Sequence, residues 1–223
     1  MPSVKIPKKS TDTDMTPFVD IAFLLLSFFI MATKFKPPEP VKVETPNSVS
    51  SDKLKTENSV LITIDNQSKV YVSFGGKTDA DKAKINGIIT DINASRNLGL
   101  TAQEINNFAT TPIIGVPFGG LKDLLKRPIQ ERETIKQPGI PVLDSLTNEL
   151  VWWIGAAKKA FGGTKLIYLL KGDNTSKYPA FEAVINSLRR NEEFKYFLIT
   201  GQEGAPAGSE LSTMRAKASQ GTQ

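Results

Sequence analysis

Two residue types are missing from the sequence, because its 223 residues include no cysteine and no histidine. Without them the chain cannot form disulfide bonds, use a thiol nucleophile or a histidine general base, or bind zinc through its usual ligands. The other side chains do not assemble a nucleophile, a base and oxyanion donors. We therefore expect no enzyme activity, no cofactor and no metal site. The lack of cysteine fits an extracytoplasmic domain without disulfides but does not define the compartment.

Blocks of like charge are also missing. The net charge of +5 comes from lysines that are scattered along the chain. A nucleic-acid-binding surface is typically a cluster of basic residues, so we do not expect nucleic acid among the partners. The length and the hydrophobic content of 39% are compatible with one or two domains and one membrane span.

A complete phosphate-binding loop is absent as well. Gly75, Gly76, Lys77 and Thr78 resemble the end of such a loop. The motif also requires a glycine five positions before Gly76, where the sequence has Tyr71. We therefore do not predict nucleotide binding.

Only one apolar run is long enough to cross a membrane. It comprises residues 15–33, MTPFVDIAFLLLSFFIMAT. These residues would rise roughly 28 Å as a helix, which is close to the ~30 Å hydrocarbon core of a bilayer. We predict a single transmembrane helix here. A cleaved signal peptide is the alternative, although the apolar core of such a peptide is usually only about 7 to 15 residues long.

Asp20 is the single carboxylate within this run. An ionised Asp near the centre of a membrane helix costs roughly 2.5 to 3.5 kcal/mol, so it normally faces water, a partner or a proton path. Thr16 and Ser27 lie four residues before it and seven after it, on the same helical face. We predict that Asp20 is a functional site and that Thr16 and Ser27 support it. Two alternatives remain: Asp20 caps the helix near the headgroups, and Ser27 bonds to its own backbone.

The residues before this helix fit a helix start. Thr13 and Asp14 can cap free amide groups, and Pro17 suits an early helical position that needs no donor. Residues 1–14 also contain three lysines, which favours a short cytoplasmic tail by the positive-inside rule. Lysines follow the run too, so the lysine distribution gives only a weak orientation signal.

Residues 59–201 have the patterns of an α+β domain, of the order ββαβαβ with a helical insertion. Proline-rich residues 34–58 precede it as an extended linker, and residues 202–223 form a polar tail that we expect to be disordered. Glycine and proline interrupt residues 76–144, which we interpret as an insertion or lid. The expected elements are strands at 59–64 and 70–74, helices at 82–94, from Thr101 with a capping box, at 121–126 before Pro128 and from Asp144–Ser145 to Phe161, a strand at 165–170, a helix at 180–189 and a strand at 195–200.

Two stretches of the sequence carry a family resemblance. Residues 14–46, DMTPFVDIAFLLLSFFIMATKFKPPEPVKVETP, resemble the ExbD/TolR family of proton-channel accessory proteins in its Bacteroidetes-like form. Residues 167–190, IYLLKGDNTSKYPAFEAVINSLRR, resemble the strand, acidic turn and second helix of the small periplasmic domain of this family. Residues 76–144 depart from the family pattern.

The resemblance implies a single-pass inner-membrane protein with a cytoplasmic N-terminus and a periplasmic domain. It places Asp20 at the proton-carrying position of the family and two copies of the helix, a homodimer, inside the pentameric pore of an ExbB-like protein. Proton passage would then energise a TonB-like rod or its Tol-system counterpart. The alternative is a TolR-like or MotB-like stator or cell-envelope binding module, for which the helix is only an anchor. A simple anchor gains nothing from a central carboxylate, so Asp20 favours the first function.

Overall fold

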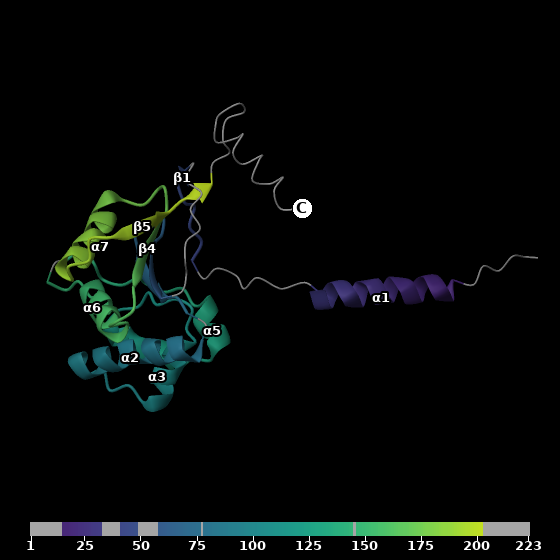
Figure 1. The fold of residues 1–223 in the computed structure, drawn as a ribbon, viewed down its shortest axis with the longest axis horizontal. Helices are drawn as coiled ribbons and strands as arrows, with labels where there is room; N and C mark the ends of the chain where they lie inside the picture. The colour runs from purple at the N-terminus through teal and green to yellow at the C-terminus, as the bar shows by residue number, and fades with distance from the viewer. Residues whose placement is uncertain (1–14, 33–40, 49–57, 77, 145, 203–223) are drawn as a thin grey trace, which may run out of the picture. The chain divides into compact units, whose positions relative to one another are not determined.

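The computed structural model describes residues 15–32, 41–48, 58–76, 78–144 and 146–202. The chain divides into two compact units, Met1–Glu39 and Pro40–Gln223. The first unit contains helix α1, Thr16–Ala32, and the second contains a mixed sheet with helices (Figure 1). The predicted α+β class is therefore confirmed. The predicted cytoplasmic tail, most of the linker and the polar tail after Gln202 lie outside the described residues.

The sheet of the second unit has four strands in the order β3-β2-β4-β5. β2 and β3 are the strands predicted at 59–64 and 70–74, and they pair as an antiparallel hairpin. β4 is parallel to both β2 and β5. Asp65 shapes the hairpin turn, because its Oδ1 accepts hydrogen bonds from the amides of Gln67 and Lys69, both at 2.8 Å. The strands are β2 Ser59–Ile64, β3 Val70–Phe74, β4 Ile167–Gly172 and β5 Tyr196–Ile199.

Alternate residues of the strands and one side of each long helix share a single hydrophobic core. Its centre contains Trp153, whose ring stacks on Phe108 with the two centroids 5.6 Å apart. The four isoleucines of the helix predicted at 82–94 are buried in this core. The helices of this unit are α2 Asp79–Arg96, α3 Ala102–Ala109, α4 Phe118–Leu125, α5 Ile129–Thr134, α6 Leu150–Ala160 and α7 Tyr178–Arg190.

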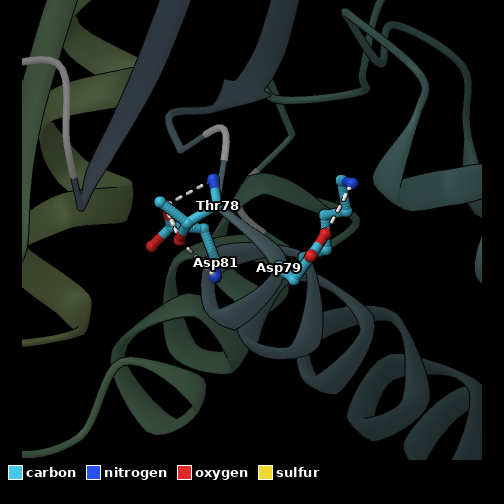
Figure 2. A network of polar contacts seen from close by, with 4 residues as sticks. Thr78, Asp79 and Asp81 are labelled. Carbon is cyan, nitrogen blue, oxygen red and sulfur yellow. Dashed lines mark hydrogen bonds and ion pairs between the residues drawn. The ribbon is translucent and has the colours of Figure 1, made fainter.

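Two of these helices begin with a reciprocal capping box. In α2 the Thr78 Oγ1 accepts from the Asp81 amide at 3.2 Å, and the Asp81 Oδ2 accepts from the Thr78 amide at 3.2 Å (Figure 2). α2 therefore begins before the predicted start at residue 82. The predicted capping box of α3 is confirmed, because Thr101 and Glu104 make the same exchange. Such caps satisfy amide groups that have no partner in the first helical turn.

The predicted start of α6 is wrong. Sequence periodicity placed it directly after Asp144 and Ser145, yet α6 begins at Leu150, and Leu146 is 95% exposed. The Glu149 amide, which would bond the carbonyl of residue 145 in the predicted helix, instead donates to the Pro141 carbonyl oxygen at 3.0 Å. Asn148 then accepts from the Leu150 amide at 3.1 Å and donates to the Val142 carbonyl oxygen at 3.0 Å.

Three short elements were not predicted. α5 follows Pro128, so this proline separates two helices instead of only ending one. β1, Asn47–Ser48, pairs in parallel with β6, Gly201–Gln202. These two strands bring part of the predicted linker to the end of the domain.

Candidate functional site

α1 presents the predicted polar residues on a helix of 17 residues. Asp20 and Thr16 are exposed, and Ser27 is half-buried. Pro17 lies in the first turn, where the Met15 carbonyl oxygen accepts from two amides at 3.1 Å. Asp14, the predicted capping residue, lies outside the described residues. Spacings of four and seven residues place Asp20, Thr16 and Ser27 on one face of the helix.

The Ser27 hydroxyl bonds to the backbone of its own helix. Its Oγ donates to the Leu24 carbonyl oxygen at 2.9 Å. Of the two roles that the sequence leaves open for Ser27, the structure contains the contact expected for the backbone role. This contact uses the hydroxyl hydrogen, while the oxygen can still accept from water or a partner.

The rest of α1 is apolar on all sides. Its large side chains are more than half exposed, including Phe18 at 64%, Leu25 at 54% and Phe28 at 63%. Such a surface is stable only when something apolar covers it. In the described part of the chain, no helix is both long enough and apolar enough to cross a membrane.

A second group of polar contacts fastens residues 41–48, which we call the clasp, to the α+β domain. The Glu44 amide donates to the Asp173 Oδ2 at 2.9 Å, and the Asn174 amide donates to the Glu44 carbonyl oxygen at 2.9 Å. The β1–β6 pairing continues this attachment. The clasp therefore lies along the turn that follows β4.

Asp173 is buried and receives hydrogen bonds from two directions. Its Oδ1 accepts from the Thr175 hydroxyl at 2.5 Å and from the Thr175 amide at 2.9 Å, and these bonds shape the turn after β4. The hydrogen bond from the Thr175 hydroxyl, together with those from the Glu44 and Thr175 amides, lowers the pKa of Asp173. The contact with Glu44 was missed because the two residues are 129 positions apart.

The glycine-rich turn before α2 is filled by a carboxylate. A Cβ added to Gly76 would lie 2.4 Å from the Cβ of Asp81. The Thr78 hydroxyl donates to the Asp81 Oδ2 at 2.7 Å (Figure 2). A carboxylate at this position repels phosphate, which agrees with the incomplete loop motif.

The chain combines an apolar helix that carries one carboxylate with a small mixed α+β domain. This is the architecture expected of a membrane-anchored protein with a folded extramembrane domain. The family model described as Biopolymer transport protein ExbD/TolR matches residues 7–203, and the chain belongs to this family. No curated protein and no solved structure matches the chain significantly. The predicted family is therefore confirmed.

Family membership carries several general statements about the chain. It implies a role in TonB- or Tol-type energy-transducing systems, a partnership with ExbB- and TonB-like proteins, and residence in the inner membrane. Proteins of the family are transport accessory proteins and not enzymes.

Proposed function

We propose that the chain is a proton-motive-force-coupled subunit of an ExbB–ExbD–TonB-like complex that powers transport across the outer membrane, with Asp20 as its proton-carrying group. The observation that supports this most is the isolated carboxylate of Asp20 on a helix whose other large side chains are apolar and exposed. Family membership supports the more general part of this proposal, which is a role in an energy-transducing system.

Residues 15–33 are proposed to form a single membrane span. The proposed span adds Met15 and Thr33 to the 17 residues of α1, and 19 helical residues would rise about 28 Å, close to the ~30 Å hydrocarbon core of a bilayer. Lipid, or the apolar wall of a pore protein, would cover the exposed phenylalanines and leucines. In this topology residues 1–14 are cytoplasmic and the α+β domain is periplasmic.

Asp20 can serve as the carrier because it can hold and release one unit of charge inside the membrane. A proton that crosses a membrane potential yields about 2.3 kcal/mol per 100 mV. The neutral acid suits an apolar wall, whereas the carboxylate needs water or a hydroxyl donor. Thr16 lies about one helical turn from Asp20 and Ser27 about two turns away, so two hydroxyls share the helical face of the carboxylate.

The proposed partners are an ExbB-like pentamer around two copies of α1 and a TonB-like transducer. The sheet supports a homodimer, because β5 is an outer strand with no neighbour on its far side among the described residues. Phe197 and Leu198 on this strand are 53% and 54% exposed. Exposed apolar edge strands readily pair with another chain, and a second copy of β5 is the occupant we propose.

Replacement of Asp20 by Asn tests the proposal. Asn has nearly the same shape but does not titrate, so Asp20→Asn should leave insertion and assembly intact while it abolishes energised uptake. Asp20→Glu keeps the acid and should retain part of the uptake. Uptake is measured in cells with equal amounts of each variant.

Alkaline carbonate extraction and co-purification of the pore protein are the controls for insertion and assembly. Full uptake in cells with Asp20→Asn would refute the carrier role. It would instead favour the stator or envelope-binding alternative, in which α1 only anchors the domain.

A further inference from the structure

The two edges of the sheet differ in how they are covered. At β5 the outer side has no paired strand among the described residues. At β3 the outer side is occupied by single residues from the segment between α3 and α6. Ile114 exchanges two backbone hydrogen bonds with Val72, both at 2.8 Å, and the Ile140 amide donates to the Val70 carbonyl oxygen at 2.8 Å.

We call residues 113–115 and 137–140 the edge cover. Its two parts are tied to each other as well as to β3. The Gly139 amide donates to the Gly115 carbonyl oxygen at 2.6 Å. The buried side chain of Gln137 accepts from the Gly115 amide and donates to the Ile113 carbonyl oxygen at 3.2 Å. The cover is therefore a built part of the domain and not a loose loop.

Tyr71 and Gly115 fix how closely the cover approaches β3. A Cβ on Gly115 would lie 2.1 Å from the Cδ1 of the Tyr71 ring, so only glycine fits there. The Tyr71 hydroxyl donates to the Asp65 Oδ2 at 3.0 Å, which holds the ring in place. Burial, and to a smaller extent the Asp65 carboxylate, raises the pKa of Tyr71, so this hydroxyl remains a donor.

We propose that the edge cover is a blocking device that prevents an extended strand of a second copy of this chain from adding to β3, so that the sheet can grow only at β5. A strand that pairs with β3 needs the Val72 amide and carbonyl groups and the Val70 carbonyl group, and all three are already bonded to the cover. With both edges open, each copy could pair with two others and form open-ended assemblies. With β3 closed, assembly stops at a pair. The β3 edge is closed whether or not Asp20 carries protons.

Two glycine-to-alanine variants, made in the full chain in detergent, test the blocking role. Gly115→Ala should push the cover away from β3, whereas Gly119→Ala is the matched control, because an added Cβ there meets nothing within 4 Å. Each variant carries Ser73→Cys on β3 as the only thiol, since the sequence has no cysteine. Hydrogen exchange at the Val72 amide reports opening of the edge, and disulfide cross-linking between copies reports strand addition.

The Val72 amide should exchange at least about tenfold faster in Gly115→Ala than in Gly119→Ala. Cross-linked dimers through position 73 should form only in Gly115→Ala. Slow exchange at the β4 amides shows that the sheet remains folded in both variants. An exposed Val72 amide without cross-linking would overturn the proposal, because the open edge would then accept no strand.

Ile114→Pro is a second route to the same state, since it removes the amide that bonds the Val72 carbonyl oxygen. If neither Gly115→Ala nor Ile114→Pro yields cross-links through position 73, the blocking role is wrong. A thiol at Lys195, next to β5, reports the other edge separately. Failure of the proposed β5 dimer would therefore be recorded independently of the β3 result.

Discussion

α1 and the α+β domain differ in how far they bury large apolar side chains. Phe28 of α1 is 63% exposed, whereas Phe108 and Trp153 of the domain are 2% and 1% exposed. The domain buries most of its apolar side chains against its own sheet and helices, and Phe197 and Leu198 of β5 are among the exposed exceptions. α1 by itself leaves its apolar surface uncovered. The domain's stability is therefore set by internal packing, while that of α1 depends on its surroundings.

The carboxylates of the two regions differ in the same way. Asp65 and Asp173 are buried, and each accepts at least three hydrogen bonds from nearby amides and hydroxyls. Asp20 is exposed and is the single carboxylate of α1. A carboxylate with several fixed donors holds local structure, whereas a lone carboxylate on an apolar helix is costly to keep in a membrane and so points to a function. This difference supports the role proposed for Asp20.

Among the variants that test this contrast, truncation of a core aromatic residue should lower the free energy of unfolding most. Trp153→Ala should lower the free energy of unfolding of the domain by about 3 to 5 kcal/mol, because it leaves a cavity in the stack with Phe108. Phe28→Ala in α1 should leave it unchanged within about 0.5 kcal/mol. Chemical denaturation of the full chain in detergent, followed by circular dichroism, measures both.

Trp152→Ala is the matched control for the core variant. Trp152 is 45% exposed and lies under the Arg96 guanidinium, whose central carbon is 4.0 Å from the ring centroid. Loss of this cation–π contact should cost about 1 kcal/mol. Equal losses for Trp152→Ala and Trp153→Ala would contradict the packing described for the core.

The sequence was informative where a signal is local. The alternation in β2 and β3, the isoleucine spacing of α2 and the capping box at Thr101 depend on residues within one element. The start of α6 was misplaced because Leu146 fits the helical spacing, whereas the Glu149 amide bonds the Pro141 carbonyl oxygen and does not close a helical turn.

Contacts between residues that are far apart along the chain leave no recognisable pattern in a single sequence. Glu44 meets Asp173, and Val72 meets Ile114, only because the fold brings these segments together. The candidate site on α1 was predictable for a different reason. A carboxylate within an apolar run stands out from the sequence alone, whereas the hydrogen bond from Ser27 to Leu24 is seen only in the structure.

Removal of the Asp173 charge should have a smaller and local effect. Asp173→Asn replaces one of the two acceptor oxygens with an NH₂ group, which donates hydrogen bonds and does not accept them. The side chain can then no longer accept from both Glu44 and Thr175 as the carboxylate does. We expect the Glu44 amide and the β1–β6 pairing to exchange faster, while the core of the domain keeps its slow exchange. Asp144→Asn, in the exposed turn before α6, is the control and should not affect the clasp.

The same contact predicts a pH dependence. Because the pKa of Asp173 is lowered in the folded chain, its charged form is favoured there, and its contribution to stability is complete above the ordinary Asp pKa of about 3.9. The contribution is lost as the pH falls through the lowered pKa. The clasp should therefore stay closed at neutral pH and open only in acid, as followed by exchange at the Glu44 amide. Opening near neutral pH would show that another group controls it.

The smallest expected effect concerns Ser27, whose side chain is bonded within α1 itself. Its hydroxyl donates to the Leu24 carbonyl oxygen, so part of its hydrogen-bonding capacity is already used inside the helix. Its oxygen can still hold a water on the face of Asp20, but it carries no charge. Hydroxyl hydrogen bonds within membranes are worth about 0.6 kcal/mol on average, so Ser27→Ala should reduce energised uptake by roughly threefold or less. Ser27→Thr keeps the hydroxyl and should retain uptake. If Ser27→Ala transports as well as the unaltered chain, the bond to Leu24 is the whole role of Ser27, and Asp20 acts without its help.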